Sequence, residues 1–406
     1  MYCIAKKINK QDLLFFPAWI LYVITVIVDL TMIAIDNNTV QMINKAIRYL
    51  VYGICAFKIL NTNYKKRSII YIVLFIIFFF LSYYRSNSRT MVLYSLIMLA
   101  AYSLNNEKII KTTAYTQGLL LLMIILLSQT GIIMDYVFDK GTRERHSLGF
   151  TWTTLGPIIF FYFAMCFVYV HRKNLKWYTI LILEGINIWL FRMTNTRMTF
   201  YLLTMFLTFF FLESINKKRF RYLSLFKSVY IIYPFVLWLL AILTCKLYNR
   251  NSHMWASINS LLSGRLNLSQ DAMNNYGLSF FGNNIEWKGF SILNTSYGAG
   301  EYNYVDSSYL QLTFNYGLIF TAVVMIIFSY GIYKAIKVND YYCVFVYMAI
   351  LTISLTEPQL MNFAFNPFSL LAFGNVTKDI ISGKWKYIHR YKRKWKMSTG
   401  ESKQTI

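Results

Sequence analysis

The chain has 406 residues, of which 57% are hydrophobic and only 14% are charged, and its formal net charge is +24. A water-soluble protein carries about 25% charged residues because its surface must face water. This composition therefore excludes an ordinary soluble domain. Apolar runs of about 20 residues, the length that crosses a bilayer core, recur from end to end. We expect an all-α, polytopic membrane helix bundle.

Excess positive charge in a soluble protein would indicate nucleic-acid binding. Membrane proteins instead concentrate Lys and Arg in their cytoplasmic loops, so we expect no nucleic-acid partner. The five cysteines are scattered and form no CxxC pair, which predicts neither a disulfide framework nor a zinc site. The sequence contains no DxD, HExxH or P-loop motif, so we expect no metal and no cofactor.

Apolar runs separated by polar breaks predict about twelve transmembrane helices. The first run is too long for a signal-peptide core and lacks a small-residue cleavage site, so we interpret it as a span. In chain order, the predicted helices lie near residues 13–35, 46–60, 68–84, 90–104, 112–134, 150–170, 176–191, 197–215, 229–247, 309–333, 341–356 and 361–376. Residues 1–376 are expected to form one transmembrane domain with a large outer loop at about 248–308.

The distribution of basic residues predicts the orientation. With the N-terminus in the cytoplasm, 28 of the 41 basic residues fall on the cytoplasmic side, in the N-terminal segment, the alternate loops and the C-terminal tail. An even number of spans then places both termini in the cytoplasm. Residues 377–406 are expected to form a basic tail that lies on anionic lipid.

The remaining basic residues, on the outer side, are mostly arginines. Topology requires only positive charge, whereas the guanidinium fork binds phosphate or carboxylate bidentately in a way that lysine cannot. The enrichment therefore indicates an anionic ligand on the outer face. Pairing with the outer acids Asp36, Asp135, Glu144 and Glu357 stays open as the alternative for any single arginine.

Three pairs of outer arginines are expected at the level of the lipid headgroups. Arg85 and Arg89 are four residues apart, so a helical end would place them on one face. The other pairs are Arg192 with Arg197, which bracket the short turn MTNT, and Arg143 with Arg145, which sit beside His146.

The long outer loop carries two further features. Ser263 is expected to cap a short helix that carries Arg265 and lies along the membrane surface. Asp306 comes just before the next span, within reach of a bound headgroup, although capping of that helix is an open alternative. Within the spans, Asp29 and Glu184 are candidates for function, or they pair with an Arg or Lys of a neighbouring helix.

Six short segments, in this order and placement, carry a resemblance to a known family. They are "RERHSLGFTWTTLGP" (143–157), "TNTRMTF" (194–200), "SGRLNLSQDAM" (263–273), "FFGNN" (280–284), "VDSSYLQLTFNYG" (305–317) and "TEPQLMNFAFNPF" (356–368). From about residue 130 to 375 the chain resembles the Wzy-type polysaccharide polymerases and the related O-antigen ligases of bacterial membranes. The family's Gly-x-Gly after the loop helix is absent, because Gly282 is followed by Asn283 and Asn284. Asp306 stands where the ligases carry His, which favours the polymerase branch.

The resemblance implies a GT-C-like membrane glycosyltransferase at the outer face of the bacterial cytoplasmic membrane. It would transfer an undecaprenyl-diphosphate-linked glycan onto a lipid-linked repeat unit. Ligase-type transfer to a cell-surface acceptor, or a non-catalytic flippase for the same lipid-linked oligosaccharide, are the alternatives. The expected partners are this lipid-linked oligosaccharide, membrane lipids, and flippase and chain-length regulator proteins.

A metal-free mechanism needs cations for the diphosphate leaving group and a proton acceptor for the acceptor hydroxyl. We expect Arg197 and Arg265 to hold the diphosphate and Asp306 to accept the proton. Further substrate-binding candidates are Arg143, Arg145, His146, Arg89, Arg192, Glu301 and Tyr309, with Glu301 and His146 also considered as the base. Tyr309 belongs to a tyrosine-rich stretch that offers rings for sugar stacking, together with Tyr297, Tyr302, Tyr304 and Tyr316.

Overall fold

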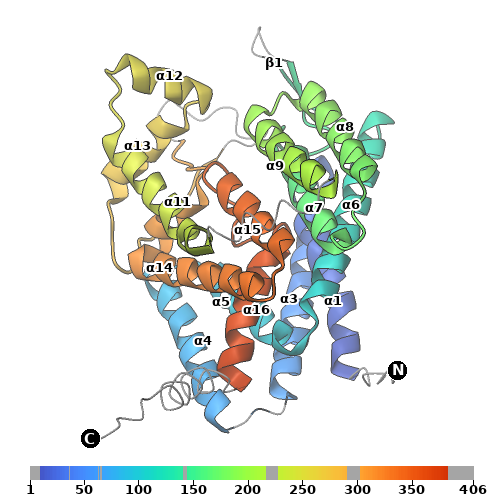
Figure 1. Ribbon diagram of the computed structural model, residues 1–406, viewed down its shortest axis with the longest axis vertical. Coiled ribbons are helices and arrows are strands. Elements are labelled where there is room, and N and C mark those ends of the chain that lie inside the picture. The colour runs from blue at the N-terminus through green and yellow to red at the C-terminus, as the bar shows by residue number, and fades with distance from the viewer. Residues whose placement is uncertain are drawn as a thin grey trace, which may run out of the picture.

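The computed structural model describes residues 10–35, 37–62, 64, 66–139, 144–215, 227–289 and 302–382. The molecule is mostly helical (75%), which confirms the expected helical architecture. The sheet in the described residues is small: β1 (Val137–Asp139) pairs antiparallel with β2 (Glu144–His146). This hairpin stands at the upper end of the molecule in Figure 1, at the end where α12 also lies.

Each predicted apolar run overlaps one of the longer helices of the described chain. These helices are α1 (Lys10–Val28), α3 (Asn38–Leu60), α4 (Lys66–Ser86), α5 (Thr90–Ala100), α6 (Asn106–Gln129), α7 (Leu155–His171), α8 (Trp177–Thr194), α9 (Arg197–Ile215), α11 (Lys227–Leu247), α14 (Ser308–Lys337), α15 (Tyr341–Ile353) and α16 (Pro367–Ser382). Short helices lie between them: α2 (Met32–Ile35), η1 (Ala101–Ser103), α12 (His253–Leu261) and α13 (Arg265–Tyr276). The first predicted run, 13–35, is divided between α1 and α2.

Within the described ranges, five helices are long and apolar enough to cross a membrane. They contain Ile69–Ser86, Asn106–Gln129, Arg197–Ile215, Lys227–Leu247 and Ser308–Lys337. Shorter apolar helices lie at Leu14–Val28, Thr90–Ala100, Leu155–His171 and Tyr341–Ile353. Several long apolar helices thus fit a multi-pass membrane protein.

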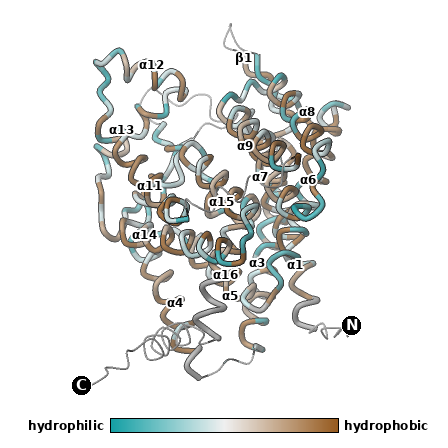
Figure 2. The backbone as a smooth tube through the Cα atoms, viewed as in Figure 1, coloured by the Kyte–Doolittle hydropathy of each residue, from teal (hydrophilic) through white to brown (hydrophobic). Residues whose placement is uncertain are grey.

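The face of α4 that is not packed against other helices is apolar, which makes water a poor solvent for this molecule. Ile70, Leu74, Ile77 and Leu81 follow one another at helical spacing and are 47–62% exposed. An apolar stripe of this length on a soluble protein would be an association site, whereas lipid tails would cover it at no cost. Figure 2 shows hydrophobic residues along the body of α4, in contrast to the hydrophilic residues that accompany α12.

Three loops that were predicted to lie on the cytoplasmic side meet at one arginine. Arg172, just after α7, donates from Nη1 to Glu107 Oε1 at 3.1 Å and from Nε to Asp340 Oδ2 at 3.1 Å. Glu107 lies in the first turn of α6, and Asp340 caps α15 by accepting from Cys343 N. The three loops therefore share one end of the molecule. The first residues of α1 and the last residues of α16 lie at the lower end of the molecule in Figure 1.

Helix α14 is broken at Gly317, whose φ of 89° lies in the region that favours glycine. The break frees backbone groups of α14, and the loop after α13 bonds to them. Leu318 N donates to Ser279 O at 2.9 Å, and Asn283 N donates to Phe314 O at 2.9 Å. The loop thereby pins the first half of α14, the half that follows Asp306.

A close approach of two glycines makes this junction possible. A Cβ on Gly282 would lie 2.1 Å from Asn315 O, and one on Gly317 would lie 2.4 Å from Phe280 O. Both positions also have positive φ. The motifs "FFGNN" and "NYG" are therefore two sides of one backbone contact, which explains the single glycine in the first of them.

Candidate functional site

A cavity of 470 Å³ opens among the loops that were predicted to face outward. Its lining comes from segments 145–158, 195–198, 263–268, 302–306 and 357–359, together with Leu30 and Gly289. Charged side chains reach it from each of these segments. They are Arg145, Arg197, Arg265, Asp306 and Glu357, and we call this space the charged cavity.

Arg265 joins the two carboxylates of the charged cavity. Its Nε donates to Asp306 Oδ2 at 2.8 Å, and its Nη2 donates to Glu357 Oε1 at 3.1 Å. All three side chains are largely withdrawn from solvent, with exposed fractions of 18%, 24% and 5% respectively. Partial burial strengthens these charge-assisted bonds relative to a surface ion pair. Acid and cation are thus held side by side in one wall.

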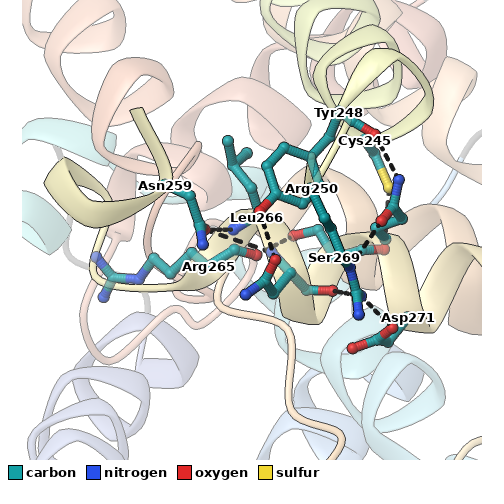
Figure 3. A network of polar contacts seen from close by, with 10 residues as sticks. Cys245, Tyr248, Arg250, Asn259, Arg265, Leu266, Ser269 and Asp271 are labelled. Carbon is teal, nitrogen blue, oxygen red and sulfur yellow. Dashed lines mark hydrogen bonds and ion pairs between the residues drawn. The ribbon is translucent and has the colours of Figure 1, made fainter. Parts of the chain in front are cut away.

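A polar network fixes α13, the helix that begins at Arg265, against α11. Asn259 Oδ1 accepts from the backbone N atoms of Leu266 (3.1 Å) and Asn267 (3.4 Å), and Cys245 Sγ donates to Ser269 O at 2.9 Å. Figure 3 shows the guanidinium of Arg265 pointing away from this network. The network therefore holds the helix and leaves the Arg265 head group free to reach its carboxylates.

The cap expected at Ser263 is wrong. Gly264, with φ of 85°, occupies the N-cap position of α13 and provides no side-chain bond. Asn259, from the end of α12, supplies the acceptor to the first turn instead. The positive φ of Ser263 and Gly264 folds the chain back so that α12 can reach α13.

The capping alternative for Asp306 is also wrong, and its ligand-binding role stays a prediction. Helix α14 begins at Ser308 with Ser307 as its N-cap residue, and Asp306 lies one residue earlier. The Asp306 carboxylate accepts from Arg265 and lines the charged cavity. Its Oδ1 atom has no hydrogen-bond partner among the residues that the structure describes, so this oxygen is available to a substrate proton.

From the sequence, Glu357 was expected only as an ion-pair partner of an outer arginine. It lies in the connection between α15 and α16, where Ser308 Oγ donates to Glu357 O and accepts from Leu360 N. Burial raises the pKa of Glu357 to about 8, Arg265 opposes this shift, and Asp306 adds to it. Burial is the largest of these causes, so it favours the neutral form of Glu357 although Arg265 bonds to it.

Arg197 and Arg145 enter the cavity from two neighbouring elements, the turn between α8 and α9 and the strand β2. The turn ends α8 with Asn195 in the left-handed conformation (φ 50°) and begins α9 at Arg197, as the bracketing of MTNT predicted. Arg145, on β2, donates from Nε to Thr194 O at 2.9 Å, which ties the hairpin to the turn. Arg197 is exposed, and no carboxylate of the described chain lies within ion-pair distance of it.

Two of the predicted sugar-stacking tyrosines reach the cavity. Tyr302 and Tyr304 line it, and burial raises the pKa of Tyr304 to about 12, which keeps its hydroxyl neutral. Tyr309 does not reach it: the side chain is fully buried and its hydroxyl donates to Leu351 O at 2.9 Å. Tyr309 therefore packs α14 against α15, in place of the substrate-binding role expected from the sequence.

Other predicted residues lie elsewhere. His146 Nδ1 bonds to Asp135 Oδ2 at 2.6 Å at the base of the hairpin, and Arg192 is exposed outside the cavity lining. Arg89 occupies the N-cap position of α5, and α4 ends before it at Ser86. The stacking of Arg85 and Arg89 on one helical face is therefore wrong, because a turn at Asn87 (φ 53°) separates them. Arg143, Glu301, Tyr297 and Asp36 lie outside the described residues.

Ion pairing accounts for part of the outer arginine excess. Arg48 pairs with Asp29, as the pairing alternative for that intramembrane acid required, and Arg250 pairs with Asp271. Glu184 makes no ion pair with an Arg or Lys of the described chain and accepts from Thr204 Oγ1 at 2.6 Å, so the pairing alternative for this acid is wrong. Arg265 also pairs, with Asp306 and Glu357, so the pairing alternative that named Glu357 is confirmed for this arginine. Arg197 lines the charged cavity without an ion pair to any carboxylate of the described chain.

The arrangement suits an anion that carries a reactive bond. Three guanidinium groups can neutralise a diphosphate, and an acidic side chain lies in the same cavity to exchange a proton. In the part of the chain that the structure describes, no group of three or more His, Cys, Asp or Glu residues is placed to hold a metal ion.

Comparison of the chain with protein-family models, with curated proteins and with solved structures finds no match. The class that the fold defines is a helical protein with several long apolar helices that fit a multi-pass membrane protein.

Proposed function

We propose that the protein is a membrane glycosyltransferase that uses a lipid-diphosphate-linked glycan as its donor. The observation that carries the proposal is the charged cavity, where Arg145, Arg197 and Arg265 share one space with Asp306 and Glu357. A diphosphate at the headgroup level needs clustered guanidinium groups, and a glycosyl transfer needs a proton acceptor beside them.

The reaction follows from these roles. Asp306 accepts the proton of an acceptor hydroxyl, and that oxygen forms a bond to the anomeric carbon of the donor sugar. The bond between the anomeric carbon and the diphosphate oxygen breaks, and its electron pair leaves with the diphosphate. Arg197 and Arg265 stabilise the negative charge that develops there, with charge-assisted bonds of about 1.5–3 kcal/mol each.

Protonated Glu357 keeps the positive potential of the cavity high. If both carboxylates were ionised, they would compete with the diphosphate for Arg265. With Glu357 neutral, Arg265 retains net charge to share with the ligand. Glu357 acts through Arg265 and is therefore a positioning residue in this mechanism.

For the membrane, the orientation and the substrates, we propose those that the sequence resemblance implies. The twelve helices span the bacterial cytoplasmic membrane in a GT-C-like arrangement, both termini are cytoplasmic, and the charged cavity opens on the outer face. The glycan passes from undecaprenyl diphosphate to a lipid-linked repeat unit, so the product is a polysaccharide. Arg172 links three loops that lie at one end of their helices, and the cavity segments lie at the other ends of these helices. This separation supports the orientation.

The test is reconstitution of the purified protein with a synthetic lipid-linked repeat unit. We expect lipid-linked chains of two or more repeats, separated by gel and counted by mass spectrometry, and a rate of chain formation lower by about 10²–10⁴-fold with Asp306→Asn protein. Transfer to a different acceptor only would favour the ligase alternative. Movement of the lipid-linked unit across the bilayer with no new glycosidic bond would overturn the enzyme proposal in favour of a flippase.

A further inference from the structure

A second cavity, of 290 Å³, adjoins the charged cavity. It lies between the start of α5, the first half of α14 and the segment 358–362. None of the described residues that line it carries a charge, so we call it the neutral chamber. Its polar lining residues include Thr90, Gln311, Asn315, Gln359 and Asn362, and its aromatic rings are those of Tyr94, Tyr304 and Tyr316.

The two spaces share a wall. Tyr304, Pro358 and Gln359 line both of them. Tyr304 precedes Asp306 by two residues, and both side chains line the charged cavity. A molecule in the neutral chamber would therefore lie next to the carboxylate of the charged cavity.

Amide groups in the neutral chamber are only partly used by the protein. Asn315 Oδ1 accepts from Trp287 Nε1 at 3.0 Å, and Gln359 Oε1 accepts from Asn362 Nδ2 at 3.0 Å. The NH₂ groups of Asn315 and Gln359 have no partner within the described ranges. Each can donate two hydrogen bonds to a ligand oxygen.

This lining has the chemistry of a saccharide site. Sugar hydroxyls need donors and acceptors in a fixed geometry, which side-chain amides provide, and the apolar face of a sugar ring packs on aromatic rings. Ligand cavities for drug-sized molecules have volumes of about 300–1,000 Å³, so the neutral chamber suits a smaller ligand of one or two sugar rings. An acidic sugar would find no counter-charge in this lining.

We infer that the neutral chamber binds an uncharged sugar of the acceptor glycan and presents its hydroxyl to Asp306. The inference rests on the proposed function, because it assigns the diphosphate to the charged cavity and the acceptor to its neighbour. It divides the substrate by charge: anionic phosphates on one side of the Tyr304–Gln359 wall, and neutral sugar on the other.

Thr90 offers the cleanest position to test this assignment. It is exposed at the first position of α5, lines the neutral chamber and is absent from the charged cavity. Thr90→Phe fills the chamber, whereas Thr90→Val removes one hydroxyl at nearly constant volume. Thr39, also exposed and at the start of α3, lines neither space, so Thr39→Phe is the matched control.

The experiment uses the full chain in lipid nanodiscs and saturation-transfer NMR with lactose, N,N′-diacetylchitobiose and digalacturonate as probes. We expect a saturation-transfer signal from an uncharged disaccharide. Its affinity should fall at least tenfold with Thr90→Phe, fall less with Thr90→Val and stay unchanged with Thr39→Phe. Absence of any saccharide signal that responds to Thr90, or a stronger signal from digalacturonate, would overturn the inference.

A second measurement separates this inference from the proposed function. Sugar-free undecaprenyl diphosphate is titrated against the same proteins and against Arg197→Lys. Diphosphate binding that survives Thr90→Phe shows that the variant is folded. Diphosphate binding that depends on Arg197, with saccharide binding indifferent to Thr90, removes the saccharide site and keeps the donor site. The opposite pattern keeps the saccharide site and removes the proposed donor.

Discussion

Arg265 Nε and Asp306 Oδ2 lie 2.8 Å apart although 41 residues separate them in the chain. The bond links α13 of the outer loop to the segment that leads into α14, and it places a cation and an acid in one wall of the charged cavity. In the proposed mechanism, Arg265 acts on the diphosphate of the donor and Asp306 acts on the hydroxyl of the acceptor, so the bond between them sets the distance between the two substrates.

Replacing Asp306 with Asn tests the proton-acceptor role. The amide oxygen of Asn can still accept from Arg265 Nε, so the wall keeps its geometry while the basic group is lost. We expect turnover to fall by about 10²–10⁴-fold, the usual contribution of a general base, with little change in affinity for undecaprenyl diphosphate. A radiolabelled transfer assay and a binding titration measure the two. Equal losses in both would assign Asp306 to Arg265 alignment only.

Arg197→Lys tests the need for a guanidinium. Lysine keeps the charge but cannot bind a diphosphate bidentately, and Arg197 has no described carboxylate partner whose loss would disturb the fold. We expect polymer yield to fall by about ten- to a hundredfold, which corresponds to one charge-assisted bond. Arg192→Lys is the matched control, because Arg192 is exposed in the last turn of α8, five residues before Arg197, but outside the cavity lining. Equal yields from the two variants would remove Arg197 from the site.

The protonation of Glu357 predicts the pH dependence of donor binding. Its pKa is raised to about 8, so the side chain is neutral below this pH and ionised above it. Ionisation lowers the net charge of the cavity by one unit, so the KM for the diphosphate donor should rise as pH increases through 8. The variant Glu357→Gln keeps an acceptor for Arg265 and cannot ionise. Its donor KM should be flat across pH 7–9, and a wild-type-like rise in this variant would assign the titration to another group.

Cation supply by arginine alone predicts tolerance to chelation. The three guanidinium groups of the charged cavity account for the charge of a diphosphate without an added ion. We expect polymer formation by the purified protein to continue in EDTA, measured against an untreated sample. Loss of activity on chelation, restored by a divalent ion, would show that a metal ion takes part.

The apolar helices could be predicted from the sequence because burial in lipid imposes a long hydrophobic run on each of them. Their ends were less accurate, since caps decide them. Helix α6 begins at Asn106, six residues before the predicted run, because Asn105 Oδ1 accepts from Glu107 N. Helix α16 begins at Pro367, a favoured first position, rather than at 361. Both signals are present in the sequence but lie outside the hydrophobic pattern.

The sequence predicted part of the cavity lining but not all of it. The segments that carry Arg197, Arg265 and Asp306 lie on the same predicted side, and the structure brings them to one cavity. The role of Glu357 depends on its burial, which no local pattern encodes. The substrate-binding role predicted for Tyr309 was wrong for the same reason, because the sequence does not reveal which face of α14 packs against α15.

Gly282→Ala tests the junction that holds the first half of α14. The added Cβ would meet the backbone of Asn315 at 2.1 Å, and the φ of 86° is strained for alanine, so we expect a loss of at least about 1–3 kcal/mol in stability. Gly185→Ala is the control: it lies in α8 with open space around it, and alanine should be neutral or stabilising by about 0.5–1 kcal/mol there. Unfolding midpoints of the detergent-solubilised proteins, followed by tryptophan fluorescence, give the comparison. A midpoint for Gly282→Ala equal to that of Gly185→Ala would mean that the loop can shift away from α14, and the backbone contact between the two glycines would then have no structural weight.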